Sequence, residues 1–307
     1  LQFLIGSTDY YYGNASMPHV SGSFSAEARI ATRVRIRETW ETDRFHTDGL
    51  NAVRSAVLFT PATTGTLTSS GGERLEVSRH RQQLEALVDV LKNFTVRGGY
   101  RYEWGDSVMK ASTYSVAGPT DRAELKRSSA LAGFMVRPVQ RLSLTGDIEI
   151  TNGDKTYYRT GLLDTHRYRF QGRVTLPMNL FFNANYSYFD NKNPNTGINY
   201  EFKSQAATAS LQWMPGGGKN ISVVADYQRS LIKSDINYLY PLGLFDVRSL
   251  YQDYAHTGTL MADLRLPFSK SYSGRLTFGG SFVTTGGTRP TDYYQPQGRL
   301  HLPVTPK

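Results

Sequence analysis

The chain has 307 residues, of which 39% are hydrophobic, 12% aromatic and 20% charged, and its formal net charge is +9. It contains no cysteine, which excludes a disulfide framework, a zinc–thiolate site, an iron–sulfur cluster and a thiol nucleophile. No run of about 18 apolar residues occurs, so a helical membrane span is excluded. A membrane protein built from β-strands is still allowed, because alternating strands average to low hydropathy.

The positive charge is dispersed along the chain. Arg and Lys recur singly at alternate positions and do not gather in a tail or on one helix face. A nucleic-acid interface needs a concentrated basic patch, so no nucleic-acid partner is expected.

Apolar and polar residues alternate along most of the chain, which predicts β-strands. In the first case, residues 26–37, the side chains of Ile30 and Val34 face away from those of Arg33 and Arg35. The same sorting recurs and predicts about twelve strands in total, each about 9 to 14 residues long. The other expected strands lie at 83–90, 94–104, 130–136, 142–150, 167–176, 180–188, 206–213, 221–228, 259–266, 275–282 and 299–304.

The connections between these strands alternate in length, which is typical of an antiparallel up-and-down transmembrane β-barrel. The short, turn-rich connections lie at 92–93, 137–140, 177–179, 215–220 and 267–272. The long, polar connections lie at 42–72, 107–120, 152–164, 191–199, 234–247 and 284–292. We expect short periplasmic turns at one rim and long extracellular loops at the other. Because about twelve strands enclose a space too wide to fill with apolar side chains, the apolar face should point outward to lipid.

The polar face is then expected to line the lumen, and it is rich in arginine. The candidate lining residues are Arg29, Arg33, Arg35, Arg37, Glu85, Asp89, Arg97, Arg101, Glu103, Asp147, Glu149, Arg167, Arg169, Arg173, Asp226, Asp263, Arg265, Arg275 and Arg299. Rings of arginine in a pore favour anions. The carboxylates on the same face allow a second interpretation, in which cross-strand pairs balance the charge.

Aromatic residues near the strand ends predict the interfacial girdles of a membrane barrel. The candidates are Trp40, Tyr102, Trp104 and Tyr188 toward the long-loop rim, and Phe94 and Trp213 toward the short-turn rim. The basic run 79–81 (Arg-His-Arg) suggests either a contact with lipopolysaccharide phosphate or a solvated strand end.

Segments such as ARIATRVRI, FTVRGGYRYEW, LFFNANYSYF and ISVVADYQRS, with turns such as MPGGGKN, resemble the outer-membrane β-barrel proteins of Gram-negative bacteria. The resemblance covers roughly 24–304 and implies a single barrel domain at 24–307, preceded by an N-terminal segment at 1–23 that ends an earlier strand. Barrels of this class typically end on a strand with a terminal aromatic residue, whereas this sequence ends in PVTPK. We therefore expect an incomplete barrel that lacks its closing strand or strands.

Three functions remain open on this resemblance. The first is a pore or sheath in the bacterial outer membrane that passes small polar or anionic solutes through an arginine-biased lumen. The second is a barrel that encloses a periplasmic or lumenal multihaem cytochrome for electron transfer across the outer membrane. The third is the barrel part of a plug-gated active transporter of the TonB-dependent type. Outer-membrane lipid and lipopolysaccharide are the expected surroundings in each case.

No enzymatic activity is expected. The sequence has no HExxH, GxSxG or P-loop pattern, and its histidines are scattered. We expect no catalytic, metal or cofactor residues, and without a CxxCH motif any haem would belong to a partner.

Overall fold

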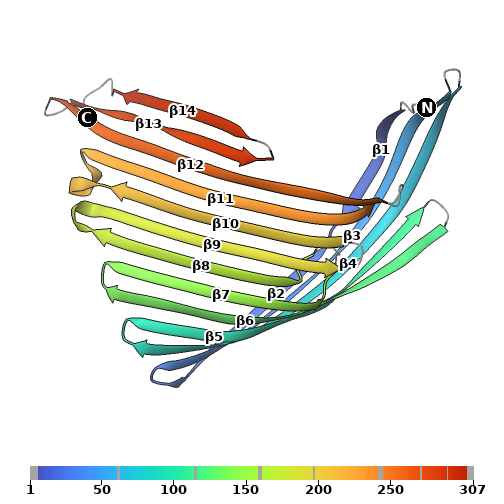
Figure 1. The fold of residues 1–307 in the computed structure, drawn as a ribbon, viewed down its shortest axis with the longest axis horizontal. Helices are drawn as coiled ribbons and strands as arrows, with labels where there is room; N and C mark the ends of the chain where they lie inside the picture. The colour runs from blue at the N-terminus through green and yellow to red at the C-terminus, as the bar shows by residue number, and fades with distance from the viewer. Residues whose placement is uncertain are drawn as a thin grey trace.

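The computed structural model of the protein is all-β, as the alternation predicts (Figure 1). Its backbone is described for residues 6–60, 63–113, 116–157, 161–195, 198–240, 245–269, 272–288 and 290–302. Side chains are described for 17–49, 74–110, 120–157, 161–194, 199–237, 248–268, 273–288 and 290–302. In the described part of the chain, no helix is long and apolar enough to cross a membrane.

One antiparallel sheet contains every described strand. The strands are β1 (Gly6–Ser16), β2 (His19–Ala31), β3 (Val34–Thr60), β4 (Thr63–Leu91), β5 (Phe94–Thr113), β6 (Val116–Val139), β7 (Leu142–Lys155), β8 (Asp164–Leu176), β9 (Leu180–Asn195), β10 (Ile198–Trp213), β11 (Ile221–Tyr240), β12 (Phe245–Ser269), β13 (Tyr272–Gly287) and β14 (Thr291–His301). From β3 onward each strand pairs with the next in the sequence, which is the expected up-and-down order. The sheet is strongly curved, with β14 at one edge and β1 and β2 at the other (Figure 1).

The first two strands share one position in the sheet. Strand β2 pairs with the first half of β3, and β1 pairs with its second half, so the 14 strands fill 13 positions. The expected boundary at residue 23 therefore falls inside β2, and β1 continues the line of β2 instead of ending a separate earlier strand. Among the described residues no pairing joins β14 to β1 or β2, so the sheet is open.

The turns described near 92–93, 137–140, 177–179 and 215–220 lie where the sequence predicts them. The turn at 32–33 was not predicted: it divides the expected strand 26–37 into the end of β2 and the start of β3 and places Arg33 in the turn. Left-handed backbone conformations make two of the predicted turns possible. Met178 and Asn179 have φ of 62° and 54° in the 3₁₀ turn η1 (Pro177–Asn179). The glycines of η2 (Pro215–Gly218) also have positive φ, which glycine adopts readily. The two turns are joined, because the Asn179 side-chain amide donates to the Met214 carbonyl at 3.3 Å.

Most of the segments expected to be long loops are strands instead. Residues 42–60 and 63–72 extend β3 and β4 as one hairpin that remains in register, so β4 reaches 29 residues. Pairing satisfies the backbone N–H and C=O groups of these polar segments. The sequence did not predict these strands, because the segments lack a clear apolar face. Between β7 and β8, the described residues 156–157 and 161–163 lie outside the sheet.

Candidate functional site

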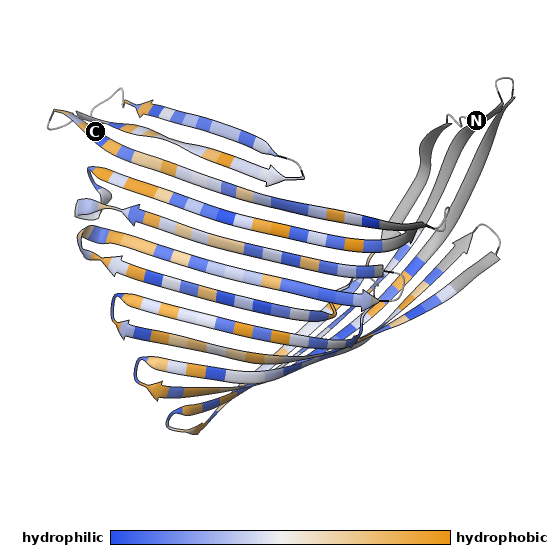
Figure 2. Ribbon diagram, in the orientation of Figure 1, coloured by the Kyte–Doolittle hydropathy of each residue, from blue (hydrophilic) through white to orange (hydrophobic). Residues whose placement is uncertain are grey.

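Hydrophilic and hydrophobic residues alternate along the strands (Figure 2). Because neighbouring residues of a strand point to opposite faces, the two faces of the sheet carry opposite chemistry. Cross-strand partners share a face, and the register joins Arg97 of β5 through Gly133 and Asp147 to Arg169 of β8. Followed strand by strand, this register places all of the predicted lining residues that lie in β2 to β14 on one face, which we call the polar face. The opposite, apolar face carries the alternating large hydrophobic side chains.

The burial of these side chains is the reverse of that in a water-soluble protein. Leu84 and Leu260 on the apolar face are 52% and 54% exposed, whereas Glu85 and Glu103 on the polar face are each 5% exposed. Among the described side chains, the buried hydrophobic ones are Val77, Leu125 and Ala262. The described part of the sheet therefore has no apolar core, and most of its buried side chains are polar or charged.

Ion pairs fill the polar face between β2 and β8. Glu27 accepts from Arg37 at 2.7 Å, and Arg35 lies between Glu27 and Asp89 at 3.6 and 3.4 Å. Each carboxylate of this group therefore faces an arginine from a neighbouring strand, which is the balanced arrangement that the sequence left open.

A second group is centred on Arg97. Its guanidinium contacts Glu85 at 3.4 Å and Asp147 at 2.5 Å. The contact with Asp147 crosses the intervening strand at Gly133, where an added Cβ would lie 2.6 Å from the Arg97 Nε and 2.7 Å from the Asp147 carboxylate. A glycine at this position thus leaves room for an ion pair that spans three strands.

Two further carboxylates are each shared by two arginines. Glu103 accepts from Arg79 at 2.9 Å and also from Arg127. In the same way Glu149 contacts Arg101 at 2.7 Å and Arg167 at 3.8 Å. These carboxylates are desolvated, and the paired guanidiniums compensate for that cost.

The β7–β8 connection folds onto the polar face. The hydroxyl of Tyr157 donates to the backbone carbonyl of Ser78 in β4, three strands away from β7. Gly105 of β5 makes this contact possible, because a Cβ there would lie 2.2 Å from the Tyr157 oxygen. Burial raises the pKa of Tyr157 to about 12.

The other end of the same connection is held by buried amides of β9. Asn191 is fully buried and accepts from the backbone N–H of Leu163 at 2.9 Å, while Asn193 donates to the Gly161 carbonyl at 3.0 Å. Arg127 adds a contact to the Leu162 carbonyl at 3.3 Å. The described ends of this connection are thus fixed over the polar face, a placement that the sequence, which predicted an extracellular loop, did not reveal.

The predicted lining residues divide into paired and unpaired groups. Asp226 and Asp263 accept from the threonines Thr259 and Thr277 and not from arginine. The remaining arginines form no ion pair among the described side chains, and of these only Arg33 makes a hydrogen bond, to the Val90 carbonyl. These unpaired residues are Arg29, Arg33, Arg169, Arg173, Arg265, Arg275 and Arg299.

The predicted basic run at 79–81 does not form one patch. Because neighbouring residues of a strand point to opposite faces, Arg79 and Arg81 lie on the polar face and pair with Glu103 and Glu41. His80 lies on the apolar face.

Aromatic side chains form a cluster on the apolar face toward the long hairpins. Trp104 stacks on Tyr102 and His80 at ring-centroid distances of 5.4 and 5.5 Å and meets Trp40 edge-on at 5.7 Å. Farther along the sheet, Tyr188 contacts Tyr168 at 5.5 Å. His80 and Tyr168 were missing from the predicted girdle set, although both are at even-numbered positions, whose side chains lie on the apolar face in these strands.

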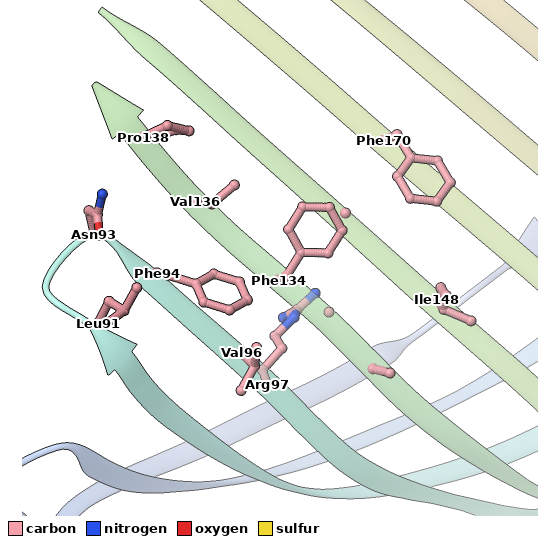
Figure 3. A pocket seen from close by; sticks show the side chains of 13 residues that line it. Leu91, Asn93, Phe94, Val96, Arg97, Phe134, Val136, Pro138, Ile148 and Phe170 are labelled. Atoms are coloured by element: carbon pink, nitrogen blue, oxygen red, sulfur yellow. The ribbon is translucent and has the colours of Figure 1, made fainter. Parts of the chain in front are cut away.

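Near the short turns, the apolar face is hollowed. A hollow of about 940 Å³ spans β5 to β8, and the rings of Phe94, Phe134 and Phe170 surround it together with Val96 and Ile148 (Figure 3). Trp213, the other residue predicted for this rim, ends β10 opposite Leu180 and Val223. The predicted rim aromatics therefore lie on the apolar face, as their parity indicates.

A small aromatic group interrupts the polar face. Phe189 and Phe202 lie 6.0 Å apart, and the Arg167 guanidinium stacks over the Phe189 ring at 5.2 Å. The sequence analysis missed this group, although the odd number of Phe189 in β9 already places it among the polar residues. In the part of the chain with described side chains, no group of His, Asp and Glu is arranged to hold a metal ion.

No protein-family model and no curated protein matches the sequence. Among solved structures, a chain of the RagAB peptide importer, solved in its "closed-closed" state, is similar with a TM-score of 0.52 and 10% sequence identity. The similarity covers 90% of this chain and 37% of the RagAB chain, so the present chain spans little more than a third of the length of that relative. At this level of identity, the similarity shows a shared fold of the antiparallel β-barrel class.

Proposed function

We propose that the chain forms part of the wall of a β-barrel in the bacterial outer membrane, and that small polar or anionic solutes pass along its polar face. The observation that carries this proposal is the reversed burial of the two faces. Large hydrophobic side chains are exposed on one face, while paired charges are packed on the other.

A lipid environment accounts for the apolar face. Exposed apolar surface is disfavoured in water by about 25 cal/mol per Å². An antiparallel sheet in a soluble protein covers its apolar face with a second layer, and the described part of this chain provides none. Acyl chains of outer-membrane lipid and lipopolysaccharide would take that place, with the clustered aromatics at the headgroup level.

The polar face suits a water-filled lumen with weak charge selectivity. Between β2 and β8 the arginines are largely neutralised by carboxylates, so that part of the lining would select mainly by size. The unpaired arginines, most of them on β8 and β12 to β14, add a modest preference for anions.

The test is conductance of the full-length protein in a planar bilayer. Ohmic steps are expected, with a reversal potential under a salt gradient that indicates a weak anion preference. Replacing Arg35 and Arg37 with glutamine leaves Glu27 and Asp89 without their partners, so the reversal potential should move toward cations. The matched control is Arg248→Gln, which breaks the 2.5 Å pair with Asp235 on the apolar face. Folded protein without conductance, or an equal shift in the control, would contradict the proposal.

The similarity to RagAB favours a second candidate, the barrel of a plug-gated importer. Such a protein would give no steady ohmic current, and its transport would depend on an energy source. Uptake of labelled peptides by cells, measured with and without a protonophore, separates the two. If the protein does not conduct and purifies with a bound haem protein, the third candidate is supported, a barrel that encloses a multihaem cytochrome.

A further inference from the structure

Two arginines and a histidine lie side by side on the polar face where β12, β13 and β14 meet. Arg265 is directly opposite Arg275, and Arg275 is directly opposite His301. In the next row of the same face, Asp263 and Arg299 flank Thr277. Directly opposed side chains have Cβ atoms about 4.5–5.5 Å apart, so these groups form one compact cluster.

The cluster differs from the ion-pair groups between β2 and β8. Like charges placed directly opposite one another on a sheet are destabilising. Between β2 and β8 the arginines of the ion-pair groups have a carboxylate partner, but none of the described ion pairs includes Arg265, Arg275 or Arg299. Asp263, the carboxylate of these two rows, accepts a hydrogen bond from Thr277.

The surroundings leave these guanidiniums open to a ligand. Arg265 and Arg275 are exposed although their strands have neighbours on both sides, and Arg299 and His301 lie on the edge strand β14. Each guanidinium has two parallel N–H groups that match the oxygens of a carboxylate or phosphate. Strands are about 4.8 Å apart, so the cluster extends about 10 Å from β12 to β14. A ligand with two oxyanion groups matches this spread.

We propose that Arg265, Arg275 and Arg299 form a binding site for a ligand with at least two oxyanion groups, such as a phosphate ester or a polycarboxylate. The anion takes the place of the missing carboxylates and removes the repulsion between Arg265 and Arg275. The site lies near the turn between β12 and β13, at the short-turn rim of the polar face. It rests on the proposed function in one respect, namely that this face is in contact with water.

The test is calorimetric titration of pyrophosphate, and separately of citrate, into the folded full-length protein in detergent micelles. Arg275→Gln should weaken binding at least about tenfold, which corresponds to one lost charge-assisted interaction. Arg275→Lys should give an intermediate loss, because lysine keeps the charge but not the two-pronged geometry. Arg299→Gln provides a second, independent variant. The control is Arg81→Gln, which removes one positive charge from the same face, at a residue that is paired with Glu41.

The outcomes separate the proposals. Tighter binding of pyrophosphate or of citrate identifies phosphate or carboxylate as the preferred group. If neither probe binds the folded protein, or if Arg81→Gln weakens binding as much as Arg275→Gln, the site does not exist. If binding is retained by a protein that shows no conductance, the pore function fails and the site stands.

Discussion

Placing an arginine on the apolar face tests the lipid assignment directly, and Ile148 is the best position. Phe94 and Tyr102, which belong to the two predicted girdles, lie about 27 Å apart along β5 at about 3.4 Å per residue. A strand tilt of about 40° reduces this distance to about 20 Å, close to the apolar band of about 25 Å. Gly98 is midway between them, and the register continues from Gly98 through Ala132 to Ile148. The same tilt shifts directly paired residues by about 3 Å per strand along the membrane normal, so Ile148 lies about 6 Å from the midplane, inside the apolar band.

The magnitude depends on what the 37% exposed side chain of Ile148 faces. In a bilayer, Ile148→Arg should reduce the free energy of unfolding by about 1–3 kcal/mol, between the values for the midplane and for the interfaces. This lowers the folding equilibrium constant by roughly 5- to 160-fold. In water the arginine would be solvated, and the change would remain within about 0.5 kcal/mol.

The assay is a guanidinium chloride titration of folding into phospholipid vesicles, followed by tryptophan fluorescence. The control is Thr145→Arg in the same strand, which faces the polar side between Met135 and Gln171 and should change stability little. Equal effects of the two substitutions, or a larger effect at Thr145, would refute the assignment of the faces.

Three further predictions concern Gly133, Tyr157 and the tryptophans. Gly133→Val should displace the Arg97–Asp147 pair and lower the free energy of unfolding by about 1 kcal/mol. The control Gly98→Val should be neutral, because a Cβ at this position on the apolar face would lie 3.9 Å from its nearest neighbour. Equal losses of stability in urea titrations would contradict this explanation. Tyr157→Phe should lower stability by about 1 kcal/mol. The pKa of Tyr157 is raised to about 12 in the folded protein, so its hydroxyl ionises first in the unfolded chain. The stability difference between the wild type and Tyr157→Phe should therefore be constant below about pH 10 and shrink as the pH rises toward 12. A stability difference that does not change with pH would contradict this assignment. All 3 tryptophans are predicted girdle residues, so spin labels near the lipid headgroups should quench their fluorescence more than labels at the acyl-chain ends, and the reverse order would exclude the girdle.

The sequence by itself determined which residues of a strand share a face, because the side-chain direction in a strand depends only on whether a position is odd or even. This local rule was sufficient to place Arg97, Asp147 and Glu149 on one face and Ile148 on the other. It was sufficient also to predict the up-and-down order, since short turns at one rim join neighbouring strands.

Only the tertiary structure decided which groups meet, because the register depends on hydrogen bonds between residues far apart in the sequence. Parity cannot show that Arg97 reaches Asp147 across Gly133, or that Arg265 faces Arg275 without a carboxylate partner. Polar segments such as 42–72 can form either loops or hairpins with similar composition. Pairing between 42–60 and 63–80 shows that this segment forms a hairpin. The position of Tyr157 over β4 was likewise beyond sequence reasoning, because its partner is a backbone carbonyl, a group that every residue carries.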